Sequence, residues 1–379
     1  MADRRAAKFS TAHLRVIETD PQTDPRWTAF VFSHPEGSVY HHPAWLKVLW
    51  KEYRQEGFYL ACESDAGQLL AVMPMMYTRG LPFNIGGPIA GQRLSSLPRT
   101  PLAGPLSTDN RATIAILKAA LQQVWQHPGL QLQLKTQGPE LDGLVEGIFC
   151  FPWRNSYVLK LPVSSQVPFR INEKQERARI KWAVNKAAKH GVVVREAETE
   201  SELRNWYGLY LETMRRNAVP PRPYRFFLAL WEILKPQRMM QLLIAEHLKG
   251  AKKRVIAGSI FLMFGHSVSY AFNGSSRRDL SLRPNDAIQW RAINDACRNH
   301  YQWFDFGEAP EERHDLARFK SKWGAEPVRM YRYYSLPPNE SEEFGDYSRG
   351  HAASLAESVW RRLPVKATEW IGNQIYSYL

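Results

Sequence analysis

Two acidic residues late in the sequence, Asp305 and Glu308, are candidate catalytic residues. Asp305 lies between two aromatic residues in Phe304-Asp-Phe-Gly307, at the end of an expected strand over 303–306. Because side chains alternate across a strand, the carboxylate leaves the apolar face and can point into a cleft. Glu308 follows at once and can accept a proton, as can Glu311 or Glu312. The alternative for Asp305 is a structural carboxylate that caps the next loop.

A second candidate site is the segment Leu282-Arg-Pro-Asn-Asp286, which precedes an expected helix over 283–299. Asn285 has the side chain of a helix cap, and the free N–H groups at a helix start attract phosphate. Arg283 adds a cation beside them. We therefore expect Arg283, Asn285 and Asp286 to hold the phosphate of a bound ligand. The alternative is an ordinary capped helix start.

Further polar residues lie where a strand or a loop can present them to a ligand. Tyr270 and Asn273 belong to the strand before that segment, and alternation places Tyr270 and Phe272 on one face. Arg215 and Arg216 precede a Pro-rich loop and can bind a phosphate or a carboxylate. For the aromatic residues, packing in the core is the alternative.

Neither metal nor thiol chemistry is expected. The three cysteines are widely spaced, at Cys62, Cys150 and Cys297, and no Cys/His cluster has the spacing of metal ligands. The pair His41-His42 has no further ligand near it. The sequence therefore predicts neither a metal site nor a disulfide framework, as in a reducing compartment.

The composition describes a basic, globular protein with room for two or three domains. The chain has 379 residues, 44% of them hydrophobic, and 50 Lys and Arg against 37 Asp and Glu give a net charge of +13. This excess favours an anionic partner such as RNA, a phosphorylated substrate or a membrane surface. Apolar runs such as Ile256 to Phe264 have the length of strands rather than of membrane helices. We expect a cytoplasmic protein that can contact a membrane surface.

An internal echo predicts two copies of one α/β unit. Leu60-Ala-Cys-Glu63, a turn with Gly67 and a second apolar run resemble Leu243-Ile-Ala-Glu246, a turn with Gly250 and the run that follows it. Strands joined first by hairpins and then by a helix imply mixed sheets with helices on their faces.

A basic stretch separates the two copies. Between Arg170 and Lys189 the sequence has seven basic residues and two acidic ones, which predicts a helix with either a solvated or an anion-binding face. The expected organisation is a loose N-terminal lead-in over 1–25, a first unit over 26–168, a basic connecting helix over 169–190, a second unit over 191–337 and a C-terminal helical tail over 338–379.

Several short motifs, taken in order, make the sequence similar to a known family. The motifs are Leu94-Ser-Ser-Leu-Pro-Arg-Thr-Pro-Leu-Ala-Gly-Pro-Leu106, the helix Lys174–His190 with Gly191–Arg195, Ala257–Phe261, Tyr270–Asn273, Leu282–Asn285, Phe304–Gly307, Phe319–Gly324 and Trp360–Pro364. This set resembles the FemAB-like, tandem GNAT acyltransferases, including the BioF2-like acetyltransferase branch, and spans roughly residues 25–375. The resemblance implies two GNAT-like domains with mixed α/β sheets, the second of which holds the acyl donor.

This resemblance implies transfer of an acyl or aminoacyl group to an amine, in an envelope or polysaccharide precursor or in a secondary metabolite. The donor it implies is an acyl-CoA thioester, slightly favoured, or an aminoacyl-tRNA. The segment Leu282–Asp286 lacks the Gly-rich loop of ordinary CoA binding, and this departure, with the basic charge, supports the tRNA donor. A third possibility is a non-catalytic GNAT pair that binds RNA or an envelope complex.

The resemblance also singles out the pair Phe319-Lys320. In aminoacyl-transferring relatives, a lysine after a phenylalanine in this segment lies near the reacting carbonyl. Lys320 would stabilise the developing oxyanion or hold a donor phosphate, with Phe319 beside the donor and Lys322 as the alternative cation. Asp305 and Glu308 would then serve the acceptor amine, which the polar residues named above would bind: Tyr270, Asn273, Arg215 and Arg216. The structural alternative for Lys320 is an exposed helix lysine.

Overall fold

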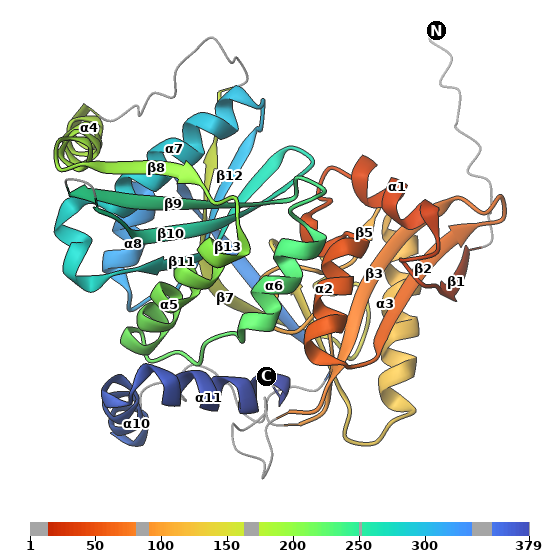
Figure 1. The fold of residues 1–379 in the computed structure, drawn as a ribbon. Helices are drawn as coiled ribbons and strands as arrows, with labels where there is room; N and C mark the ends of the chain where they lie inside the picture. The colour runs from red at the N-terminus through yellow and green to blue at the C-terminus, as the bar shows by residue number, and fades with distance from the viewer. Residues whose placement is uncertain (1–13, 81–90, 163–173, 250–251, 336–350, 379) are drawn as a thin grey trace, which may run out of the picture.

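One mixed sheet runs through the molecule in the computed structural model, which describes residues 14–80, 91–162, 174–249, 252–335 and 351–378 (Figure 1). Within these ranges 13 strands pair in the order β1-β2-β3-β4-β6-β13-β7-β12-β11-β10-β9-β8, with β5 beside β3. The strands are β1 Leu14–Glu18, β2 Gly57–Ser64, β3 Leu69–Thr78, β4 Arg93–Ser95, β5 Leu106–Ser107, β6 Gln131–Thr136, β7 Phe149–Lys160, β8 Val192–Glu196, β9 Met240–Lys249, β10 Lys252–Phe264, β11 Ser267–Ser275, β12 Trp303–Ala309 and β13 Glu326–Tyr334.

Helices cover both faces of this sheet (Figure 1). They are α1 Pro25–Ser33, η1 Val39–His41, α2 Pro43–Tyr53, α3 Asn110–Trp125, α4 Lys174–Lys189, α5 Glu200–Arg216, α6 Tyr224–Ile233, η4 Arg277–Leu282, α7 Pro284–Arg298, α8 His314–Ser321, α10 His351–Arg362, α11 Val365–Ile375 and η5 Tyr376–Tyr378. The expected basic connecting helix corresponds to α4, and its first part falls outside the described residues.

The two halves follow the same order of elements, which confirms the predicted fold class of tandem α/β units with mixed sheets. A first strand (β1 or β8) is followed by two helices, a three-strand meander, one helix (α3 or α7) and two further strands, between which the second half adds α8. The echo in the sequence has a structural counterpart. Arg15 on β1 pairs with Glu63 at 2.5 Å, and Arg195 on β8 pairs with Glu246 at 2.8 Å.

The halves exchange their last strands, so they share one sheet instead of forming two. β7, from the first half, pairs antiparallel with β12, and β13, from the second half, pairs with β6. β7 and β13 also pair with each other at the centre. Strand pattern alone predicts two mixed sheets, because it does not say which sheet edge a strand will join.

The N-terminal lead-in over 1–25 was predicted to be loose, and this is wrong for its described part. Residues Leu14–Glu18 form β1, which pairs along its whole length with β2, and Asp24 caps α1 by accepting from the Arg26 N–H. The five residues Leu-Arg-Val-Ile-Glu do not alternate strictly, and so short a run does not separate an edge strand from a loop.

Three cores hold these elements in place. α3 packs on the first half of the sheet, and α7 packs on the second half together with α4. The third core joins the halves, where α2 lies beside α6 at the centre of Figure 1 and the Trp45 ring meets the Phe226 ring edge-on at 6.0 Å. In the C-terminal tail, Tyr376 stacks on Tyr53 with ring centroids 5.2 Å apart. This packing fixes the two halves around the space between them.

Candidate functional site

A fork between β11 and β12 is the feature around which the candidate site is built. The two strands run parallel and pair from Ser267↔Trp303 to Ser269↔Asp305, and no further pairs between them form among the described residues. β12 then continues along β7 with an irregularity between Asp305 and Glu308. Gly307 turns the chain there with φ +74°, a conformation that a side chain disfavours. Asp305 therefore lies at the apex of the fork.

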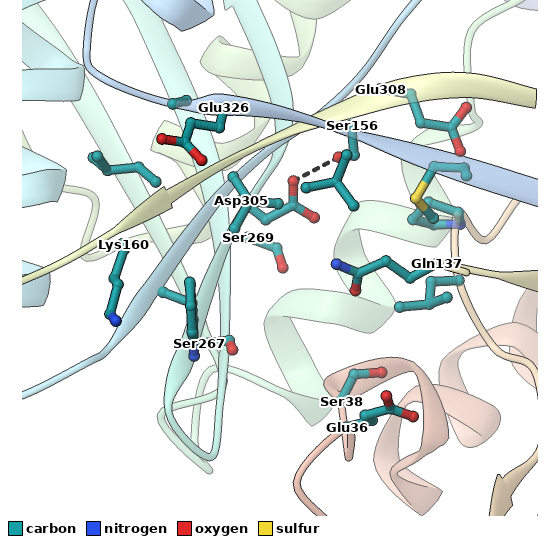
Figure 2. A pocket seen from close by; sticks show the side chains of 18 of the residues that line it. Glu36, Ser38, Gln137, Ser156, Lys160, Ser267, Ser269, Asp305, Glu308 and Glu326 are labelled. Carbon is teal, nitrogen blue, oxygen red and sulfur yellow. Dashed lines mark hydrogen bonds between the residues drawn. The ribbon is translucent and has the colours of Figure 1, made fainter. Parts of the chain in front are cut away.

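A large cavity opens in front of this apex, between the two halves. Its volume is about 1550 Å³. It is lined by the segment before α2, the loop before β5, the end of β6, β7, the starts of β11 and β12, and the segment from α8 into β13. Figure 2 shows Asp305, Ser156 and Ser269 on one side, with Glu36 and Ser38 of the first half facing them. Both halves therefore contribute to one site.

Asp305 combines exposure to this cavity with a perturbed acidity. Its Oδ1 accepts a hydrogen bond from Ser156 Oγ at 2.7 Å and another from the Gly307 N–H at 2.7 Å (Figure 2 draws the first). Burial raises the pKa of the Asp305 carboxyl, against these hydrogen bonds and the nearby charge of Lys320. A carboxylate of raised pKa is a better proton acceptor than an ordinary aspartate.

Lys320 is a buried residue and not the exposed helix lysine of the structural alternative. It is 3% exposed, and its Nζ donates to the backbone carbonyls of Gly307 at 2.7 Å and Glu308 at 2.8 Å. Burial lowers the pKa of the Lys320 ammonium to about 8. Lys320 does not line the cavity. Through these two hydrogen bonds, Lys320 holds the bend in β12 next to Asp305 and Glu308.

Glu308 lines the cavity but is held by two partners. Its Oε1 lies 3.1 Å from a guanidinium nitrogen of Arg332, and its Oε2 accepts from Trp153 Nε1 at 3.0 Å. The Arg332 side chain is only 9% exposed, so this ion pair is shielded from water. Of the two predicted carboxylates, Asp305 is thus the one without an ion pair among the described residues.

The start of α7 differs from the phosphate site expected there. Asn285 does not cap the helix: the N-cap residue is Arg283, in a left-handed conformation with φ +62°, and no side chain caps this end. The Arg283 guanidinium lies over the exposed Trp182 ring, 5.3 Å from its centre. Asp286 is buried and pairs with Lys322. A carboxylate therefore sits at the helix start where an anionic ligand was predicted.

Phe319, which was expected beside the donor, also lies outside the cavity. Phe319 contacts the Lys322 ammonium, 4.3 Å from the ring centre, and does not reach the cavity wall. Of the segment between 282 and 323, the cavity is lined by Trp303, Asp305, Glu308, Ser321, Lys322 and Trp323.

The placement of Tyr270 and Phe272 on one face is wrong because of a β-bulge. β10 pairs with β11 at Ile260↔Phe272 and then at Phe261↔Tyr270, which leaves Ala271 unpaired and reverses the alternation. Phe272 packs with α6, whereas Tyr270 stacks on Phe261 in the core beneath α7. Tyr270 therefore does not line the cavity.

Three other predicted residues lie apart from the fork. Asn273 accepts a hydrogen bond from Ser259 Oγ at 3.2 Å and is not part of the cavity wall. Arg215 and Arg216 line a second, smaller hollow of about 150 Å³ at the end of α5. The structure thus brings together Asp305 and Glu308, with Lys320 behind them. Lys322, the alternative cation, also lines the cavity and is paired with Asp286, whereas the other predicted residues lie outside the cavity.

Sequence reasoning missed several residues around the apex. Ser156 donates a hydrogen bond to Asp305. Ser269 lies opposite Asp305 across the parallel pair, and it lines the cavity together with Tyr40 of the first half. The alternation Ser267-Val-Ser269 on β11 was a usable signal. Nothing local could place Ser156 beside Asp305, because that contact depends on the strand exchange.

Two classes of feature are absent from the part of the chain that the structure describes. No group of three or more His, Cys, Asp or Glu side chains there is arranged to hold a metal ion. No helix in those ranges is long and apolar enough to cross a membrane.

Comparison with known proteins identifies the fold. Residues 174–321 match the family model described as "Acetyltransferase (GNAT) domain". Among curated proteins, no relative matches the sequence.

Similar solved structures cover most of the chain. They include FemX (TM-score 0.63, 14% identity, 84% of this chain and 96% of that one) and L-PGS from Bacillus licheniformis (TM-score 0.53, 14% identity, 92% and 99%). A tandem GNAT protein from the clavulanic acid biosynthesis pathway, in a structure without AcCoA, matches with TM-score 0.50 and 10% identity, over 86% and 99%. The chain therefore carries a GNAT domain over residues 174–321 and has the tandem GNAT, FemAB-like fold over most of its length.

Proposed function

We propose that the protein is an N-acyltransferase that transfers an acyl group to an amine held in the cavity between the halves. The observation that carries this proposal is the fork, where β11 and β12 part at Asp305 and the carboxylate faces the cavity. The GNAT domain match supports the class of reaction.

The reaction needs three things from the chain: alignment of the amine, a proton acceptor and donors to the developing oxyanion. Asp305 takes a proton from the amine, whose nitrogen attacks the donor carbonyl. The new C–N bond forms, the bond from carbon to the leaving sulfur or oxygen breaks, and the leaving group takes up a proton. After Ser269, β11 no longer pairs with β12 among the described residues, so the backbone N–H groups on that edge of β11 have no partner on β12. We propose that these N–H groups donate hydrogen bonds to the developing oxyanion.

The donor follows from the start of α7. An ordinary CoA diphosphate would need free N–H groups there, but Pro284 has none and the Asp286 carboxylate occupies the same helix end. We therefore propose an aminoacyl-tRNA ester as the preferred acyl donor. An acyl-CoA thioester is the second candidate, which the GNAT domain match favours.

The acceptor follows from the size of the cavity. Its volume of about 1550 Å³ exceeds the roughly 300–1,000 Å³ of pockets for drug-sized ligands. Polar and charged side chains on its walls, such as Glu36, Gln137 and Lys160, suit a large polar molecule. We propose an amine on an envelope or polysaccharide precursor, in preference to a small secondary metabolite.

The test is transfer itself. Acetyl-CoA and tRNA charged with labelled amino acids are each incubated with the protein and with amines that include amino sugars and peptidoglycan-type peptides. Mass spectrometry then detects the new amide. We expect one donor class to be consumed by wild-type protein and not by Asp305→Asn. Absence of turnover with every donor would support a non-catalytic binding pair instead.

A further inference from the structure

Four arginines from three separate elements surround the smaller hollow. Arg215 and Arg216 end α5, Arg277 begins η4, and Arg361 belongs to α10 of the C-terminal tail. Glu212 is the one acidic residue in its wall. The hollow measures about 150 Å³, the liquid volume of about five water molecules, which is the scale of one or two phosphate groups.

Intramolecular contacts leave much of this positive charge unused. Arg216 makes only long contacts, at 3.4 Å to Thr213 Oγ1 and 3.5 Å to Ser275, although a guanidinium has five N–H donors. The Arg277 side chain is exposed and makes no hydrogen bond or ion pair with another described residue. Arg361 pairs with the exposed Glu357 of its own helix at 2.7 Å.

The local helix explains only half of this cluster. The C-terminal end of α5 attracts cations, so Arg215 and Arg216 have a structural reason to be there. That reason does not extend to Arg277 or Arg361, which come from other elements. Like charges gathered at one hollow repel each other, and the charge of Arg277 acts with burial to lower the pKa of Arg216. A bound anion would remove this repulsion.

The hollow lies at the far end of the strand that forms the fork. Arg216 contacts Ser275, the last residue of β11, whereas β11 leaves β12 at Ser269. Six residues of extended strand span about 20 Å. A ligand whose carbonyl lies at the fork and whose phosphate lies in the hollow must therefore be long and extended.

We propose that this arginine hollow binds a phosphate or diphosphate group of the acyl donor. Arginine pairs with phosphate oxygens through two parallel N–H groups, which suits several guanidiniums around one small space. The phosphate belongs either to the diphosphate of CoA or to the 3′-terminal nucleotides of tRNA. Binding of the anion stands independently, whereas its assignment to the donor rests on the proposed function.

Titration calorimetry at low salt with pyrophosphate, CoA and uncharged tRNA tests this site. Each is titrated into wild-type protein, Arg277→Gln and Arg216→Gln, with Arg111→Gln as a control that removes an equal charge from the exposed start of α3. Each hollow variant should lose about tenfold or more in affinity for pyrophosphate and for the true donor, while Arg111→Gln changes little. Arg277 is exposed and without a described partner, so its variant should fold.

The outcomes distinguish CoA from tRNA as the source of the phosphate, and they test the phosphate site separately from the role of Asp305. A loss for CoA assigns the hollow to a thioester donor, and a loss confined to tRNA and pyrophosphate assigns it to an aminoacyl ester. Equal affinities of the hollow variants and Arg111→Gln for all three ligands would overturn the site. If Asp305→Asn keeps full turnover while Arg277→Gln abolishes binding, the hollow stands and the assignment of Asp305 fails.

Discussion

The two halves build the same fork and put different side chains at its apex. In the first half β4 runs parallel to β6 and the pairing ends at Ser95↔Gln133, and in the second half β11 and β12 pair up to Ser269↔Asp305. Both apices keep a serine on one strand. The other strand carries a neutral amide in the first half, where Gln133 accepts from Ser95 Oγ at 3.2 Å, and a carboxylate in the second.

A buried lysine lies beside each fork, but the two lysines hydrogen-bond to different parts of the chain. Lys135 lies on β6 itself, two residues past the apex, and donates to the carbonyls of Leu97 and Thr100, which closes the first fork with its own loop. Lys320 comes from α8 and holds the β12 backbone from behind, so the second fork stays open to the cavity. If the proposed function holds, the first unit serves as a scaffold and the second carries the reacting groups.

The largest expected effect comes from exchanging the apex residue of the second half for an amide. Asp305→Asn can still accept the Ser156 and Gly307 hydrogen bonds at Oδ1, but it cannot take up a proton. We expect turnover to fall by about 10²–10⁴-fold with the melting temperature nearly unchanged. Gln133→Ala, the matched change in the first half, should leave kcat within about threefold. Equal losses from both variants would break the comparison between the forks.

The two lysines give the next test. Lys320→Met and Lys135→Met each leave two carbonyls without their lysine donor, so each should lower the free energy of unfolding by on the order of 2 kcal/mol. Chemical denaturation measures this loss. Only Lys320→Met should also reduce kcat, by about tenfold or more, because only Lys320 positions the corner beside Asp305. A kcat loss from Lys135→Met in folded protein would count against the division of roles.

A smaller effect concerns the joint between the halves. Glu52 on α2 is buried and lies 3.2 Å from Arg225 on α6, and burial raises the pKa of its carboxyl to about 7. A raised pKa stabilises the folded state at low pH, and this stabilisation is lost as pH rises from about 4.5 through 7. Relative to Glu52→Gln, the wild type should lose on the order of 2–3 kcal/mol of unfolding free energy over that range. Parallel pH profiles of the two proteins would contradict this.

The smallest expected effect is on the surface of the second half. Lys181 and Lys186 lie on α4, where Lys186 and Arg283 both contact the exposed Trp182 ring. If the donor is tRNA, its affinity should fall steeply with ionic strength, and Lys181→Gln with Lys186→Gln should reduce the log–log slope by about two. A salt titration of tRNA binding measures this slope. Binding of CoA, without any tRNA binding at low salt, would reject the tRNA donor.

Local sequence patterns predicted most of the elements of the second half and the residue at its fork. The expected helix over 283–299 is α7, Pro284–Arg298, and the expected strand from Trp303 is β12. Asp305 was identifiable because a carboxylate between two buried phenylalanines can only be accommodated on the other face of its strand. The echo around Glu63 and Glu246 likewise predicted the repeated unit, because a strand–turn–strand pattern is encoded by residues that are close together in the sequence.

What could not be predicted depends on contacts between distant segments. The exchange of β7 and β13 brings Ser156 to Asp305, and a single unpaired residue, Ala271, turns Tyr270 away from the face predicted for it. The gathering of Arg277 and Arg361 with α5 needs the C-terminal tail to fold back. None of these contacts leaves a periodic signal in the sequence.

The central claim is that Asp305 accepts the proton of the amine. The most direct test is the pH dependence of single-turnover amide formation, measured for wild-type protein and for Asp305→Asn with the donor that the wild type consumes. If Asp305 accepts the proton, the wild-type rate should rise with pH through an acid limb set above the ordinary pKa of an aspartate, because burial raises the pKa of this carboxyl. The residual rate of Asp305→Asn should lack that limb. An acid limb of the same position in both proteins would place the proton acceptor elsewhere and contradict the account.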